Sequence, residues 1–175
     1  MEFARHHVQF FTAVCHGWLP LLASDESKLM LIRALRHRVE RQQVKIGGYV
    51  IMPNHFHVIW RVSNYIVPSD FQRDLLKFTA RELISHIRKT GGELALEPLY
   101  VGTKDRTFQV WKRNSMVVDL FTEKFINQKL EYIHDNPCQP HWLLAKHPVE
   151  YRFSSARFHE SEVDEFGIMS HVDDL

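Results

Sequence analysis

The sequence predicts an α+β protein with the architecture of a ferredoxin-like αβ sandwich: an antiparallel sheet, helices on one face, and an added C-terminal helix. Three observations lead to this fold class. The predicted elements follow the order strand, helix, strand, strand, helix, strand. A very short turn separates the second and third strands, which favours an antiparallel hairpin. One more helical segment follows the fourth strand. We expect the other face of the sheet to be free for function.

The first half of the chain supplies three strands and one helix. Residues 7–15 (HVQFFTAVC) are aromatic and β-branched, which is typical of a strand. Ser24 is a suitable N-cap for a helix whose apolar residues then recur at helical spacing. Residues 44–52 and 55–62 are predicted to be two strands on either side of a Pro-Asn turn.

The second half of the chain is less regular. A second helix is predicted over residues 69–88, where a pair of glycines follows and ends it. Residues 93–106 have the composition of a loop, and residues 107–114 (TFQVWKRN) are a weaker candidate for the fourth strand. A third helix is predicted over residues 119–135, and an Asn-Pro pair ends it.

The composition is that of an ordinary soluble globular protein, with 45% hydrophobic and 25% charged residues. The formal net charge of +1 does not indicate a globally basic surface for nucleic acid, so any basic patch must be local. No apolar run approaches the roughly 20 residues of a membrane-spanning helix, and two cysteines are too few for a disulfide framework. We therefore expect one cytoplasmic domain over residues 1–175, with residues 160–175 as an acidic surface or mobile tail.

The third predicted strand carries two histidines that should face the same way. Side chains alternate along a strand, so His55 and His57 share one face with Ile59, while the intervening residues form a wholly apolar face. Two imidazoles spaced in this way can bind one cation. A pair alone is also compatible with two ordinary hydrogen-bonded histidines, so a metal site requires a third ligand.

Residues 129–137 (KLEYIHDNP) offer both a third ligand and a nucleophile. On a helix, Tyr132 and Asn136 are four residues apart and lie on one face. The carboxamide oxygen of Asn136 is a hard ligand that suits Mg²⁺ or Mn²⁺, and Lys129 lies one turn before Tyr132, where it can meet a phosphate. In an unidentified helix, the same pattern more often means a half-buried core tyrosine and an asparagine that ends the helix.

Taken together, these segments resemble a known protein family. His55-Phe56-His57, within VIMPNHFHVIW, is similar to the His-hydrophobe-His (HUH) motif of single-tyrosine transposases of the insertion-sequence type. YIHDNP, followed by PVEYRFSSARFH, resembles the tyrosine helix and tail of REP-associated tyrosine transposases. The similarity extends from the first strand to about His159, and the two motifs have the order and spacing of the family.

The resemblance implies a metal-dependent endonuclease and strand transferase that acts on single-stranded DNA beside hairpin (palindromic) elements. It implies that His55, His57 and Asn136 bind a divalent metal ion, Mg²⁺ or Mn²⁺, and that Tyr132 is the catalytic nucleophile. Attack by the tyrosine would give a covalent 5′-phosphotyrosine and a free 3′-hydroxyl. Relatives act either as monomers or as homodimers that exchange tyrosine helices, and both possibilities stay open.

Cationic residues provide the candidate DNA contacts. On the second predicted helix they recur every four residues, a pattern that is also typical of a solvated helix face. The stretch VWKRN places a tryptophan beside two cations, which suits stacking on an unpaired base but also fits a core tryptophan between surface charges. The candidate DNA-binding residues are Arg73, Lys77, Arg81, Arg88, Trp111, Lys112, Arg113 and Lys129.

Two other functions are compatible with parts of this pattern. One is a non-catalytic or domesticated nucleic-acid-binding module of the same fold, which the two intact motifs disfavour. The other is a metal phosphoesterase that uses water as its nucleophile, which would need a second cluster of ligands. The remaining histidines form no comparable pair on a strand. Formation of a covalent DNA adduct distinguishes all three functions.

Overall fold

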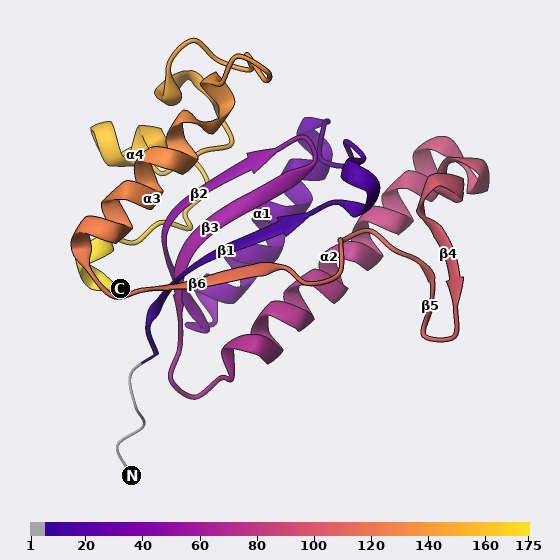
Figure 1. Ribbon diagram of the computed structural model, residues 1–175, viewed down its shortest axis with the longest axis horizontal. Helices are drawn as coiled ribbons and strands as arrows, with labels where there is room; N and C mark the ends of the chain where they lie inside the picture. The colour runs from indigo at the N-terminus through magenta and orange to yellow at the C-terminus, as the bar shows by residue number, and fades with distance from the viewer. Residues whose placement is uncertain (1–5) are drawn as a thin grey trace.

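The computed structural model describes residues 6–175, so residues 1–5 of the expected domain lie outside the described part. Its centre is a four-stranded antiparallel sheet with the strand order β2-β3-β1-β6 (Figure 1). Counted along the chain this is the order 2-3-1-4 of a ferredoxin-like sandwich, so the predicted fold class is confirmed. The strands of this sheet are β1 (Val8–Val14), β2 (Val44–Met52), β3 (His55–Val62) and β6 (Met116–Leu120).

Local hydrogen bonds explain where two of the three long helices begin. At the start of α1, Oγ of Ser24 accepts a hydrogen bond from the backbone N–H of Ser27 at 3.1 Å, as its predicted capping role requires. At the start of α3, Oγ1 of Thr122 accepts from the backbone N–H of Phe125 at 3.2 Å. The helices are α1 (Asp25–Glu40), α2 (Pro68–Gly91), α3 (Glu123–Asp135) and the short α4 (Ala156–Ser161). Over residues 6–175, none of them has the length and apolar character needed to cross a membrane.

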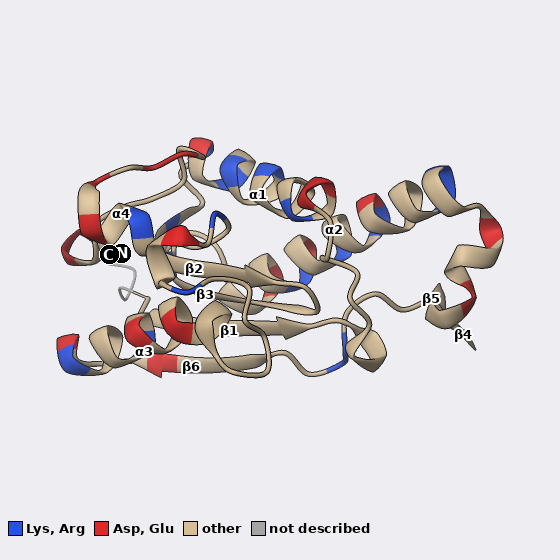
Figure 2. Cartoon of the chain, turned by 90° about the horizontal axis from the view of Figure 1, so that it is seen from above, with Lys and Arg blue, Asp and Glu red and all other residues tan. Residues whose placement is uncertain are grey.

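The two faces of β3 are buried in two separate apolar clusters. The larger cluster also contains residues of α1 and α2, whereas the second cluster contains residues of α3. Figure 2 shows α1 and α2 on one side of the sheet and α3 on the other. The predicted alternation along the strand is confirmed, but the expectation that the second face is free is wrong, because α3 covers it. The β3 residues of the larger cluster are Phe56, Val58, Trp60 and Val62.

A glycine of β2 allows α3 to lie close to the sheet. A Cβ atom on Gly48 would lie 2.4 Å from Cδ2 of Leu130 and 3.2 Å from Cδ1 of Ile133, both residues of α3. Any side chain at this position would therefore push against the helix. The pairing of β2 with β3 also shifts register between Ile46 and Gly48, which marks a β-bulge at the glycine pair.

Two boundaries in the second half differ from the prediction. The fourth strand of the sheet is not residues 107–114 but residues 116–120 (MVVDL), which pair with β1. The third helix begins at Glu123 and not at Asp119. The physical reason is that the Val-Val pair favours the extended backbone, while Thr122 is the N-cap of a helix that begins four residues later than predicted.

The segment between α2 and the fourth strand is also more structured than the loop predicted over residues 93–106. It contains a 3₁₀ helix and a two-stranded antiparallel hairpin, which lies apart from the main sheet (Figure 1). The remaining short elements are η1 (His16–Trp18), η2 (Glu93–Leu99), β4 (Tyr100–Thr103), β5 (Arg106–Phe108), η3 (Asn136–Cys138), η4 (Pro148–Glu150) and η5 (Val172–Asp174).

The C-terminal segment is packed against β2. Phe166 and Ile168 are buried in the larger cluster, and the backbone N–H of Ser170 donates to the carbonyl oxygen of Ile46 at 2.8 Å. Leu175 is buried in the second cluster. Most of residues 160–175 lie at the surface, as expected, but three apolar side chains (Phe166, Ile168 and Leu175) anchor this acidic segment to the rest of the fold.

Candidate active site

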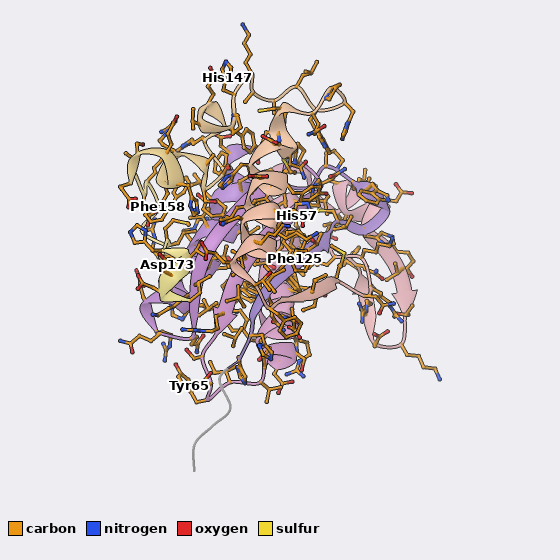
Figure 3. All side chains as sticks on the ribbon, turned by 60° about the vertical axis from the view of Figure 1, so that its left-hand side comes forward. His57, Tyr65, Phe125, His147, Phe158 and Asp173 are labelled. Atoms are coloured by element: carbon orange, nitrogen blue, oxygen red, sulfur yellow. The ribbon has the colours of Figure 1, made fainter. Side chains whose placement is uncertain are left out.

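β3 places His55 and His57 side by side. Because they are two residues apart on a strand, both side chains leave the same face, and their ring centroids are 4.8 Å apart. Their exposed fractions are only 8% and 4%. Figure 3 shows His57 beside the ribbon of α3, so the pair lies under that helix and not on an open sheet.

Each imidazole is oriented by a hydrogen bond at Nδ1. Nδ1 of His55 lies 2.7 Å from Oδ1 of Asn54, and Nδ1 of His57 lies 2.6 Å from Oγ1 of Thr12. A carboxamide oxygen can only accept, so Nδ1 of His55 carries the proton and its Nε2 keeps a lone pair. When Nδ1 of His57 likewise carries the proton and donates it to Oγ1 of Thr12, its Nε2 keeps a lone pair that can bind a cation. Within residues 6–175 this buried nitrogen has no hydrogen-bond partner.

Both imidazoles are neutral at physiological pH. Burial, together with the nearby His141, lowers the pKa of His55 to about 4. Burial lowers the pKa of His57 to about 3, with further contributions from His55 and Lys129. Neutral imidazole is the form that binds a metal ion, so the pair needs no deprotonation before it can act as a ligand.

α3 brings Tyr132 to this pair. The ring centroids of Tyr132 and His57 are 5.5 Å apart in an edge-to-face arrangement. Tyr132 itself is 53% exposed, so a substrate can reach it. Lys129 places Nζ 5.7 Å from the Tyr132 ring centroid and 4.9 Å from that of Phe10. The tyrosine helix thus docks beside the histidine strand, as the sequence analysis requires.

Asn136 lies at the C-cap of α3, four residues after Tyr132, and is buried with an exposed fraction of 7%. The chain turns at this point, and the turn carries the ring of Trp142 to 5.9 Å from the ring of His55, measured between centroids. The turn that begins at Asn136 therefore closes the site on the side of His55.

The three candidate ligands have donor atoms of the kind that a divalent cation binds. Two neutral imidazoles and one carboxamide oxygen supply nitrogen and oxygen ligands. The partnerless Nε2 of His57 supports this fit, because a buried polar atom is costly unless something binds it. In the described part of the chain no group of three or more His, Cys, Asp or Glu side chains is arranged to hold a metal ion. That finding does not bear on this set, whose third member is an asparagine.

The candidate DNA-binding cations of α2 lie on a helix that packs on the opposite face of the sheet from Tyr132. Arg73 is held by two carboxylates at 2.7 and 3.2 Å, and Arg88 pairs with Glu93. Lys77 and Arg81 are exposed and form no ion pair within residues 6–175. Figure 2 shows that basic and acidic residues are interspersed along both α1 and α2.

Trp111 is a core residue. Its exposed fraction is 6%, and its Nε1–H donates to Oγ1 of Thr79 at 3.1 Å. The prediction that it stacks on an unpaired base is therefore wrong, and the alternative interpretation as a core tryptophan holds. Its neighbours Lys112 and Arg113 are exposed, and the guanidinium of Arg113 lies 3.7 Å from the carboxylate of Asp105.

Three residues of the site were missed by the sequence analysis. Thr12 and Asn54 orient the imidazoles, and Phe10 stacks on His57 with 5.2 Å between ring centroids. Alternation along β1 gives a partial signal, because Phe10 and Thr12 share a face and pair in register with Ile59 and His57. Which strands neighbour β3 must be known before that signal can be used.

A cavity of about 690 Å³ lies elsewhere, between α1 and α2. It opens on the sheet face away from His57, so we do not regard it as part of the site. The candidate active site is instead the surface between α3 and β3.

Comparison with known proteins identifies solved structures that share this fold. The sequence matches no protein-family model and no curated protein. The structure is similar to that of a REP-associated tyrosine transposase bound to a REP hairpin, with a TM-score of 0.63 and 18% identity over 100% of this chain and 92% of the other. It is also similar to a protein from Deinococcus radiodurans R1 that is provisionally described as a transposase, with a TM-score of 0.50 and 18% identity over 77% of this chain and 94% of the other. The chain therefore has the fold of a REP-associated tyrosine transposase, the family that its two motifs resemble.

Proposed function

We propose that this protein is a transposase, which cleaves and rejoins single-stranded DNA at hairpin-flanked sites through a divalent metal ion and a covalent 5′-phosphotyrosine. The observation that carries the proposal is the accessible phenol of Tyr132, whose ring lies 5.5 Å from that of the buried, neutral His57. The shared fold with a transposase in complex with a REP hairpin adds support.

In the proposed reaction Tyr132 is the nucleophile. Its phenolic oxygen forms a bond to the scissile phosphorus, and the bond between phosphorus and the 3′ oxygen breaks. The proton lost by the phenol balances the proton gained by the departing 3′-hydroxyl. In the phosphotyrosine, a bond from phosphorus to the tyrosine oxygen replaces the bond to the 3′ oxygen. A second 3′-hydroxyl can therefore attack this phosphorus, join the strands and release Tyr132.

His55, His57 and Asn136 are the residues that would hold the cation. When bound there, a divalent ion would withdraw electron density from a non-bridging phosphate oxygen and favour attack in line with the leaving group. Thr12 and Asn54 keep the two imidazoles oriented and in the correct tautomer, as partners of metal-bound histidines generally do.

Lys129 has a different role, since its ammonium group lies beside the phenol and would attract the phosphate to be attacked. Tyr132 and His57 meet here within one chain. That geometry supports a protein whose tyrosine acts in its own site, with no need to exchange helices with a second copy.

The direct test is covalent capture of DNA. The protein is incubated with Mn²⁺ and an oligonucleotide in which single-stranded segments flank a hairpin, and the products are separated on a denaturing gel. We expect a protein–DNA adduct with the original protein and none with Tyr132→Phe. Chelation of the metal with EDTA and the substitution His57→Ala should each lower the yield by about 100-fold or more, because loss of an outer partner alone costs about 10–100-fold.

Tyr65→Phe is the matched control, because Tyr65 is also an exposed tyrosine, 66% accessible, but lies at the other end of β3 (Figure 3). It should form the adduct normally. An adduct that persists in Tyr132→Phe would refute the assignment of the nucleophile. DNA binding without any adduct would favour the non-catalytic module of the same fold.

A further inference from the structure

An exposed tryptophan lies on the segment that is hydrogen-bonded to the candidate site, and it belongs to neither apolar cluster of the described residues. Trp18, in η1 after the end of β1, is 58% exposed. Its backbone has a φ of +58°, and the preceding Gly17 has a φ of +59°. Such a conformation is rare and unfavourable for a bulky residue, and here it coincides with an indole turned to solvent.

Hydrogen bonds through Asn54 connect Trp18 to His55, one of the two candidate metal ligands on β3. Nδ2 of Asn54 donates to the carbonyl oxygen of Trp18 at 3.4 Å, and Oδ1 of the same carboxamide lies 2.7 Å from Nδ1 of His55. The backbone N–H of Leu22 also donates to the carbonyl of Pro53 at 2.8 Å. One asparagine therefore connects the segment that carries the exposed indole to the strand that carries the histidines.

A cation lies over the exposed ring. Nζ of Lys112 is 5.8 Å from the ring centroid of Trp18, within the range of a cation–π contact. The backbone N–H of Lys112 donates to the carbonyl of Val14 at 2.7 Å, which fixes this residue at the end of β1. Lys112 is exposed and forms no ion pair in the described part of the chain, so its charge is available to a ligand.

We propose that Trp18 and Lys112 form a binding site for an unpaired nucleobase and its phosphate, next to the position of the scissile phosphate. This inference rests on the proposed function and names the part of the substrate that the site would hold. An exposed indole gives a flat surface for base stacking, and a neighbouring ammonium group neutralises the phosphate of the same nucleotide. Trp18 thus takes the stacking role that the sequence analysis gave to Trp111.

The other tryptophans do not compete for this role. Trp60 and Trp111 are buried, and Trp142 is half-buried against His55. A partner protein or a second copy of this chain could also cover an exposed tryptophan, but a cation over the ring and the bond through Asn54 to a histidine of the site favour a nucleotide. Contact between two copies is one of the outcomes of the test below.

The test measures binding without cleavage, in protein that carries Tyr132→Phe. The probe is a short fluorescein-labelled oligothymidylate, compared with a blunt-ended hairpin that has no unpaired tail. We expect Trp18→Ala to weaken oligothymidylate binding by about 10-fold, since one base stacked on an aromatic ring contributes about that much. Trp18→Phe should retain most of the affinity, and binding of the blunt hairpin should change by less than about twofold. Tyr65→Ala, which removes an exposed ring of similar size far from the site, should leave both affinities unchanged.

Three results would overturn the proposal: unchanged oligothymidylate binding in Trp18→Ala, equal loss for the blunt hairpin, or loss that accompanies dissociation of a dimer in sedimentation. A thermal melt of each variant shows whether it is folded. Failure of the proposed function is a separate result, because it appears as the absence of a covalent adduct with Tyr132 in place. If the adduct forms while Trp18→Ala binds normally, the nucleobase site is wrong and the transposase assignment stands.

Discussion

The two ring nitrogens of His57 are in different situations. Nδ1 is satisfied by Thr12, whereas Nε2 is buried without a partner among the described residues. A buried imidazole in this state resists protonation, since a charge would be introduced under α3 next to Lys129. Thr12→Val removes the hydroxyl group that binds Nδ1 but keeps the size of the side chain, so it should affect the orientation of His57 more than its burial.

The low pKa of His57 and of His55 predicts acid sensitivity of the metal-free protein. Both pKa values, about 3 and about 4, lie below the value of 6.5 for a free histidine, so the unfolded chain binds protons that the folded chain does not. The folded state therefore has its full stability above pH about 6.5, where both histidines are neutral in either state, and loses stability as the pH falls towards about 4. We expect the free energy of unfolding to decrease by about 1–2 kcal/mol per histidine between pH about 7 and about 5.

Urea unfolding in EDTA at several pH values measures this effect. His57→Gln, which cannot titrate in this range, should reduce the dependence on pH, whatever it does to stability at neutral pH. His37→Gln on the exposed face of α1 is the control. An equal dependence on pH in His57→Gln and in the original protein would contradict the prediction.

For single residues, the sequence predicted on which face of a strand a side chain lies better than it predicted how deeply that side chain is buried. Strand alternation alone was enough to put His55 and His57 on one face, because that periodicity is a property of the local backbone. Their burial could not be predicted, since it depends on α3, which is distant in the chain. The same limit applies to Trp111, which is buried against distant parts of the chain and donates a hydrogen bond to Thr79 of α2.

Among the elements, the contact between α3 and β2 controls where Tyr132 lies. Gly48→Ala would place a methyl group 2.4 Å from Leu130 and 3.2 Å from Ile133, so the helix or its side chains must move. Small-to-large changes in a packed interface cost about 1–3 kcal/mol, and we expect a loss of stability in this range. Because Tyr132 lies on the displaced helix, the rate of adduct formation should fall as well.

Gly47→Ala is the matched comparison, because its Cβ would meet Cδ1 of Leu175 at 2.6 Å and not α3. We expect it to lower stability but to leave adduct formation nearly unchanged. The two rates are compared under conditions in which both variants are fully folded. Equal rates in the two variants would show that the packing of α3 does not position the nucleophile.

The elements that the sequence located best are those with local determinants. Ser24 begins α1, and the Pro-Asn turn gives the end of β2 and the start of β3 without error. The boundary between β6 and α3 was misplaced because Asp119 is compatible with a helix start, and the strand forms only by pairing with β1. The N-cap of α3, Thr122, was not predicted.

Over the whole molecule, the topology followed from the order of the elements, while the covering of the second sheet face and the packing of residues 160–175 did not. Both depend on a few apolar side chains from distant parts of the chain, such as Ile133 and Leu175, which belong to one cluster and each lie against a glycine of β2. Local patterns in an acidic segment give little indication of such contacts.

The distribution of charge over the molecule leads to a last prediction, which concerns the DNA outside the cleavage site. α2 lies on the opposite side of the sheet from Tyr132. Lys77 and Arg81, two of its exposed cations without an ion pair among residues 6–175, would therefore contact DNA that extends around the protein, such as the hairpin. We expect the double variant Lys77→Ala/Arg81→Ala to weaken hairpin binding and to reduce the slope of log affinity against log salt by about 2, since each phosphate contact contributes about 0.9. Binding of a short oligothymidylate should change little.

Arg73→Ala is the control, because Asp70 and Asp74 already neutralise this residue. Fluorescence anisotropy titrations at several salt concentrations measure the slopes, and an unchanged slope in the double variant would mean that α2 makes no contact with DNA.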